Sequence, residues 1–131
     1  MELPPNTNRG TRKEIALNFE RLVASGQIRE AFEKYVSSSF RHHNPYFKGD
    51  REALLLGLEK NAGQFADKIY EVQRDLEDGE LVAIHSRLKP KPDWPDMAIV
   101  HIFRFEGDMI VEEWDLSIQM PGDGLNDNGL F

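Results

Sequence analysis

IFRFEGDMIVEEWD, residues 102–115, restricts the fold more than any other stretch of the sequence. Apolar residues lie on both sides of Gly107-Asp108, and such a dipeptide is typical of a tight turn between two antiparallel strands. Extending the apolar pattern outward from the turn predicts one strand at about 97–105 and a second at about 110–120. We therefore expect a hairpin near the end of the chain.

The register of this hairpin decides which side chains share a face of the sheet. A two-residue turn of Gly107-Asp108 would set His101 opposite Trp114. A three-residue turn that includes Met109 would set His101 opposite Asp115. Only the second register, or a β-bulge, brings His101 and Asp115 to one face. The residues alone leave this choice open.

The rest of the chain predicts an α+β layout. Thr11 and Glu14 form a capping-box pattern, and Asp50 can cap a later helix. The expected helices cover residues 11–25, 28–38 and 50–64. Two further strands, at 69–77 and 81–88, are joined by Asp78-Gly79. Three helices followed by four antiparallel strands predict helices packed on one face of a curved sheet.

Composition excludes several classes of function. The chain has 131 residues, of which 40% are hydrophobic, and this suits a single domain with a real core. A net charge of −7 with scattered basic residues argues against nucleic acid as a partner. No apolar stretch is long enough to cross a membrane, and no signal peptide is evident. With no cysteine in the chain, these features favour a cytoplasmic protein.

The loop RHHNPYFKGD, residues 41–50, gathers more reactive side chains than any other loop. His43, Asn44 and Tyr46 could anchor the polar groups of a ligand, because imidazole, amide and phenol all form directional hydrogen bonds. The alternative is a turn that closes the preceding helix, with His42 exposed. Two more histidines, His85 and His101, lie in the predicted strands.

Two of these segments are similar to one known family. Residues 40–45, FRHHNP, resemble the aromatic-x-Gln-His-Asn-Pro segment of SnoaL-like polyketide cyclases, which belong to the nuclear transport factor 2-like superfamily. Residues 102–115 are similar to the closing hairpin of that family, including its Trp-Asp pair, and 82–86 to its histidine-bearing middle strand. The resemblance covers roughly residues 12–120.

The resemblance implies an α+β cone in which three N-terminal helices pack on a curved antiparallel sheet of about four strands around an internal pocket. The SnoaL-like domain would span 11–120, after a flexible lead-in at 1–10 and before a mobile tail at 121–131. At position 42 this chain has histidine where the family usually has glutamine, so His43 matches the family's His-Asn-Pro motif.

The resemblance also implies a catalytic pair. In the polyketide cyclases a His and an Asp promote an aldol closure without a cofactor, and the matching residues here are Asp115 and His101. Many relatives have aspartate at the position of His101, so the chain agrees with the cyclase type there. A carboxylate and an imidazole suit proton transfer beside a carbonyl. The remaining candidates would bind the substrate: His43, Asn44, Tyr46, His85, Phe103 and Trp114.

These features predict an enzyme that catalyses aldol-type cyclisation, isomerisation or retro-aldol cleavage of an apolar, carbonyl-bearing small molecule. Hydrolysis in the same cone is a further reading, and the main alternative is a non-catalytic ligand-binding or dimer-scaffolding module. We expect a homodimer that pairs through the sheet. No HExxH or His-x3-His motif occurs, so no metal and no cofactor is expected. A zinc site built from His43, His85 and His101 is the alternative.

Overall fold

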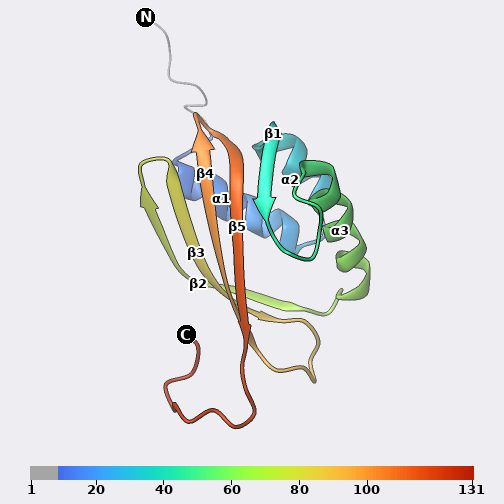
Figure 1. The fold of residues 1–131 in the computed structure, drawn as a ribbon, viewed down its shortest axis with the longest axis vertical. Coiled ribbons are helices and arrows are strands. Elements are labelled where there is room, and N and C mark those ends of the chain that lie inside the picture. Colours follow the sequence, from blue (N-terminus) through green and yellow to red (C-terminus); the bar gives the residue numbers. More distant parts are fainter. Residues whose placement is uncertain (1–8) are drawn as a thin grey trace, which may run out of the picture.

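The computed structural model describes residues 9–131 as three helices packed on one five-stranded sheet (Figure 1). The helices and strands are α1 Arg12–Ala24, α2 Ile28–Tyr35, β1 Val36–His43, α3 Arg51–Gln64, β2 Ile69–Asp78, β3 Leu81–Lys89, β4 Met97–Glu106 and β5 Met109–Gln119. In the view of Figure 1, α1 lies behind the sheet, and α2 and α3 lie beside β1. The predicted α+β class is confirmed.

The sheet has one more strand than the sequence predicted, and it is mixed. Its order is β1-β5-β4-β3-β2, and β1 runs parallel to β5 while the other pairs are antiparallel. The prediction of helix over 28–38 was wrong beyond Tyr35, where α2 ends. Val36 is β-branched and the following serines are poor helix formers. Val36, Phe40 and His42 instead bury one face of a strand.

The helix starts follow the predicted caps. The Thr11 hydroxyl accepts a hydrogen bond from the Glu14 backbone N–H, and the Glu14 carboxylate accepts one from the Thr11 N–H. The Asp50 carboxylate accepts a hydrogen bond from the Ala53 N–H. These bonds satisfy amide groups that have no partner within the helix.

The core is built from aromatic and aliphatic side chains of α1, α2 and the sheet. Phe19 of α1 contacts Phe32 of α2 and Phe103 of β4, each at a ring distance of 5.6 Å. Edge-on and tilted contacts of this kind stabilise aromatic pairs. This core holds α1 against the concave face of the sheet, so that one face of α1 points toward β4.

A β-bulge settles the register of the final hairpin. The turn is the two-residue form, with Glu106 paired to Met109 and Gly107 at a φ of 60°. The register then shifts between Arg104 and Phe105, and Val111 is the extra residue. As a result His101 pairs with Asp115. The bulge therefore places both side chains on one face.

The C-terminal end of the chain lies outside the helices and strands. Residues 121–131 form no helix or strand, and the Phe131 ring stacks against His85 at 5.8 Å. Most of the predicted lead-in, residues 1–8, lies outside the described part of the chain. None of the helices within residues 9–131 is long and apolar enough to span a membrane.

Candidate active site

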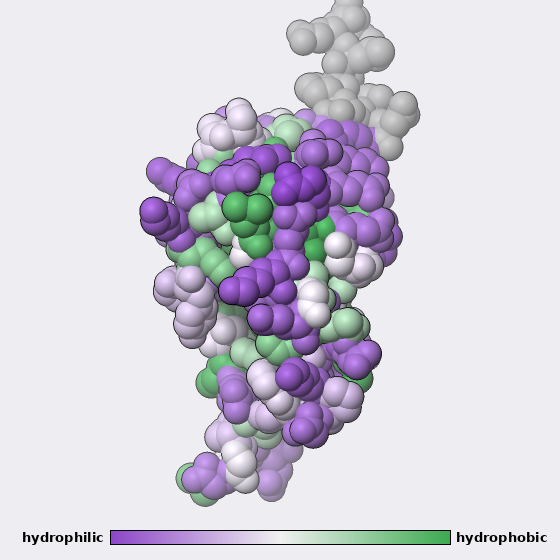
Figure 2. Space-filling model, turned by 90° about the vertical axis from the view of Figure 1, so that its right-hand side faces the viewer, coloured by the Kyte–Doolittle hydropathy of each residue, from purple (hydrophilic) through white to green (hydrophobic). Residues whose placement is uncertain are grey.

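A cavity of about 580 Å³ lies between the helices and the concave face of the sheet. That volume is typical of sites for small organic molecules. Most of the surface is apolar, and the apolar lining residues are Val23, Ala24, Pro45, Phe47, Leu58, Ala62, Phe65, Leu88, Pro90, Trp94, Met97, Ile99 and Leu116. Seen from the side of α3, the outside of the molecule is mixed, with hydrophilic side chains predominating (Figure 2). The cavity is thus more apolar than the surface around it.

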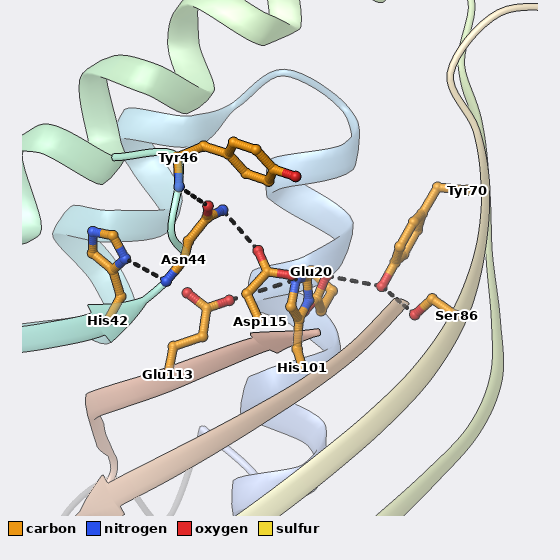
Figure 3. Close-up of polar contacts among 9 residues, drawn as sticks. All are labelled: Glu20, His42, Asn44, Tyr46, Tyr70, Ser86, His101, Glu113 and Asp115. Atoms are coloured by element: carbon orange, nitrogen blue, oxygen red, sulfur yellow. Dashed lines mark hydrogen bonds and ion pairs between the residues drawn. The ribbon is translucent and has the colours of Figure 1, made fainter. Parts of the chain in front are cut away.

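A cluster of hydrogen-bonded polar residues meets this apolar lining (Figure 3). His101 is at its centre: Nδ1 donates to the Glu20 carboxylate at 2.5 Å, and Nε2 lies 3.4 Å from the Asp115 carboxylate. The Asn44 amide donates to the other Asp115 oxygen at 2.9 Å. The Tyr70 hydroxyl donates to Glu20 at 2.8 Å. These five residues come from α1, the loop after β1, β2, β4 and β5, and all five line the cavity.

Local structure holds Asn44 in place. Its backbone N–H donates to His42 Nδ1 at 3.1 Å, and its side-chain oxygen accepts from the Tyr46 N–H at 3.0 Å. The second bond is an Asx turn, which fixes the amide plane. The His42 ring is itself held, because Nε2 donates to the Lys48 carbonyl oxygen at 2.5 Å. The amide of Asn44 is therefore fixed toward Asp115.

The pair His101–Asp115 is charged at neutral pH. Burial lowers the pKa of His101, but the Glu20 charge and hydrogen bonds to Asp115 and Glu20 outweigh it, so the pKa lies well above 6.5. Burial raises the pKa of Asp115, but the hydrogen bond and charge of His101 and the Asn44 amide outweigh it, so this pKa is lowered. Asp115 is thus a carboxylate beside an imidazolium.

A second carboxyl group lies beside the same imidazole and behaves in the opposite way. Glu113 is 5% exposed, and its carboxyl oxygen lies 3.8 Å from His101 Nε2. Burial raises the pKa of Glu113 to about 8; His101 lowers it, and Glu20 and Asp115 add to the rise. Burial and then the Glu20 charge also raise the pKa of Tyr70. At neutral pH Glu113 and Tyr70 are therefore both uncharged, Glu113 beside His101 and Tyr70 beside Glu20.

Four of the residues predicted from the sequence line the cavity. Asp115, His101 and Asn44 meet within hydrogen-bonding or ion-pairing distance, as described above. Tyr46 lines the mouth and is 84% exposed. The structure thus brings together the predicted catalytic pair and part of the predicted ligand-binding loop.

The other four predicted residues are not among those that line the cavity. His43 stacks on Trp114 at 5.1 Å, and His43 Nε2 lies 2.7 Å from the Glu112 carboxylate. His85 contacts Arg74 and the Phe131 ring. Phe103 is fully buried in the core beneath His101.

His42, which we expected to be exposed, is instead 5% exposed and supports Asn44. Alternation along a strand explains the exchange. His42 and His43 are adjacent in β1, so when one faces inward the other faces outward.

Three polar residues of the cluster were not predicted: Glu20, Tyr70 and Glu113. A signal for Glu20 was present, because it follows Ala16 at i+4 on the apolar face of α1. A carboxylate on a buried helix face needs a partner. Tyr70 and Glu113 gave no such signal, since their inward orientation depends on two bulges, one in β2 and one in β5.

One group of side chains within residues 9–131 could hold a metal ion. Ligand atoms of Glu20, His101 and Glu113 lie within 4.8 Å of one another. The zinc set considered from the sequence is not assembled, because His43 and His85 do not line the cavity with His101. Both nitrogens of His101 already lie near carboxylates, and a metal would have to displace one of these contacts.

The chain matches no protein-family model and no curated protein. Solved structures do match. An NTF2-like protein of unknown function from Cytophaga hutchinsonii is 16% identical at a TM-score of 0.69, covering 86% of this chain and 94% of its own. Wild-type IdmH from Streptomyces antibioticus, a candidate polyketide cyclase, is 20% identical at a TM-score of 0.66, and the match covers 82% of this chain and 92% of IdmH. A candidate SnoaL-like polyketide cyclase from a Jannaschia species is 16% identical at a TM-score of 0.64, and the match covers 86% of this chain and 91% of that protein.

These likenesses identify the fold. The chain has the α+β architecture of NTF2-like proteins and of SnoaL-like polyketide cyclases. The resemblance seen in the sequence is confirmed at this level. Because one fold of this kind hosts many activities, the function must be argued from the site.

Proposed function

We propose that the protein is a cofactor-independent enzyme that removes a proton beside a carbonyl group of an apolar small molecule. The observation that carries this proposal is the Asp115 carboxylate, which lines an apolar cavity and is held by the His101 imidazolium and the Asn44 amide. A fixed carboxylate inside an apolar cavity is suited to general-base catalysis. The substrate class is an apolar compound with a carbonyl group.

Asp115 would act as the base. It would take the proton from carbon, and the electron pair of the C–H bond would move to the carbonyl oxygen as an enolate. One Asn44 N–H is bound to Asp115, so the second is available to stabilise that oxygen. His101 would balance the charge of Asp115 and return the proton through it. The enolate would then attack a second carbonyl in a cyclisation, or be protonated elsewhere in an isomerisation; a retro-aldol cleavage would generate it directly.

The strength of the base limits the substrate. Because the pKa of Asp115 is lowered, its carboxylate is a weak base, and it would act best on a C–H bond that is already acidic. A carbon between two carbonyl groups meets this condition. The candidate polyketide cyclases that share this fold are in keeping with such a substrate. Aldol-type cyclisation is therefore the preferred reaction among the three.

The test is proton exchange on a simple ketone, which does not need the natural substrate. In heavy water, 2-tetralone should exchange the hydrogen beside its carbonyl faster with the protein than in buffer. Asp115→Asn should slow this exchange by about a hundredfold or more, with ligand affinity within about tenfold. Ser117→Ala is the matched control, because Ser117 lines the same cavity from the same strand. Equal exchange by both variants would remove Asp115 from the mechanism.

The second candidate is a ligand-binding module without catalysis. The pairing of both His101 nitrogens favours it, because the same network would also serve to hold α1 against the sheet. This reading predicts that 2-tetralone binds and that no exchange above buffer occurs. The exchange experiment therefore decides between the two functions.

We also propose that two copies pair through the outer face of the sheet, with strands β3 and β5 toward the partner. Ile118 of β5 is 58% exposed, Leu76 of β2 is 67% exposed, and neither lines the cavity. Exposed apolar side chains that gather on one face are typical of interaction surfaces. A homodimer would cover them. A location in the cytoplasm stays a prediction from the sequence.

A further inference from the structure

We propose that the ligand carries a carboxylate, bound by Lys68 at the end of the cavity away from Asp115. This inference rests on the cavity being the ligand site proposed above. Lys68 is half-buried and is the only lysine or arginine that lines the cavity in the part of the chain the structure describes. In a chain with a net charge of −7, a cation on a ligand cavity marks a place for an anion.

Lys68 has no ion-pair partner among residues 9–131. Other half-buried or exposed cations near the sheet do: Arg87 pairs with Glu71 and Asp96, and Arg104 pairs with Glu112. The neighbouring carboxylate in sequence, Asp67, is exposed and does not line the cavity. A half-buried lysine that lines an apolar cavity without an ion-pair partner gains most from a counterion that arrives with the ligand.

The sheet register separates Lys68 from His101, and Tyr70 lies between the two levels. Lys68 precedes Ile69, which pairs with Lys89 of β3. His101 pairs with Ile84 of the same strand. These two levels are five residues apart along β3, which corresponds to roughly 17 Å at the rise of a β-strand. An elongated ligand could therefore place a carbonyl beside Asp115 and an acid group beside Lys68.

The rim next to Lys68 also favours an anion. The ammonium group of Lys91 lies over the rings of Phe65 and Trp94, at 5.6 and 5.1 Å from their centres. Both rings line the cavity. These cation–π contacts keep a second positive charge at this end without neutralising it. Asp93 is close in sequence, but it does not line the cavity.

The number of donors indicates a carboxylate in preference to a phosphate. Phosphate sites usually combine several backbone N–H groups or an arginine fork. Here one lysine lines the cavity, and its backbone N–H is already bound to the Phe65 carbonyl at 3.3 Å. Lys68 is the one cation that lines the cavity, and the Lys91 ammonium lies on the rim over Phe65 and Trp94, so direct contact is expected with a single negative charge. The proposed ligand is thus an apolar acid with a ketone at the far end.

Calorimetric titration with two probes of equal chain length tests this inference without any turnover. Decanoate and 1-decanol differ only in the acid group. The parent protein should bind decanoate more tightly than 1-decanol, and added salt should narrow the difference. Lys68→Met should weaken the binding of decanoate by about three- to tenfold and leave the affinity for 1-decanol unchanged. Lys60→Met, at an exposed position of α3, is the control and should change neither affinity.

The outcomes separate this inference from the proposed function. If Lys68→Met loses affinity for both probes equally, or loses no affinity for decanoate, the role of Lys68 is overturned. Binding of neither probe by the parent would overturn the cavity as a ligand site, and both proposals with it. If decanoate binds through Lys68 while Asp115→Asn leaves proton exchange unchanged, the acid-binding role stands and the catalytic one fails.

Discussion

Replacement of Glu113 by glutamine should change how the stability of the protein depends on pH. Glu113 is 5% exposed, and burial raises its pKa from 4.5 to about 8. Between these two values the folded state keeps a proton that the unfolded state has lost. Stability from this group is therefore complete below pH 4.5 and falls as the pH rises to about 8. Glutamine has the same shape and does not ionise, so Glu113→Gln should remove this loss.

The size of the effect follows from the shift. A pKa moved from 4.5 to about 8 corresponds to at most about 5 kcal/mol. The pKa of about 8 already includes the His101 charge, which stabilises the ionised form, and only part of the shift falls between pH 5 and pH 9. We expect Glu113→Gln to gain about 2–4 kcal/mol in free energy of unfolding, relative to the parent, between pH 5 and pH 9.

Urea unfolding followed by tryptophan fluorescence at pH 5 and pH 9 measures this gain. Glu112→Gln is the control, because Glu112 is adjacent, also buried, and shifted the opposite way. The hydrogen bond from Arg41, opposed by burial and supported by His43 and Arg104, lowers the pKa of Glu112 to about 2.

The contribution of Glu112 to stability is present above pH 4.5 and lost only as the pH falls toward 2. Glu112→Gln should therefore be less stable than the parent by a similar amount at pH 5 and pH 9. If Glu113→Gln and the parent lose the same stability between pH 5 and pH 9, the assignment of a buried, protonated Glu113 is wrong.

Two further predictions concern the cluster and the sheet face. Glu20→Gln should lower the pKa of His101, because the Glu20 charge is the largest cause that raises it, and should cost about 2–4 kcal/mol of stability. NMR titration measures the pKa of His101, and urea unfolding measures the stability. The surface change Glu59→Gln is the control and should cost under about 1 kcal/mol. Ile118→Arg should convert the proposed dimer to a monomer in sedimentation while the fold is retained, because Ile118 is exposed and does not line the cavity. A parent that is already monomeric at micromolar concentration would refute the dimer.

Local signals predicted most of the fold. The caps at Thr11 and Asp50 and the turns at Gly79 and Gly107 all depend on residues that are adjacent or a few positions apart, so the sequence shows them directly. The strand β1 was missed because it forms by pairing with β5, about seventy residues away. A partner so distant leaves no local pattern, and the preceding apolar spacing of α2 was extended into it.

The candidate site shows the same limit at the level of side chains. Asp115 and His101 were found because a resemblance named them, and the bulge at Val111 that aligns them could only be offered as one of two choices. Glu20 was overlooked because a carboxylate in a helix is usually solvated. Its role depends on His101, 81 residues away, which provides the charge that burial of Glu20 requires.

The coupled charges of Asp115 and His101 explain how one site could both accept and return a proton. While Asp115 is a carboxylate, it helps to raise the pKa of His101. Once Asp115 has taken a proton from the ligand, that support is lost, and the His101 proton is held less tightly. The enolate would then lie beside a neutral Asp115 and a more acidic His101, which both line the cavity, whereas Glu113 does not. Asp115 or His101 could return a proton to carbon, so the proposed step that forms the enolate would also prepare the groups that complete the reaction.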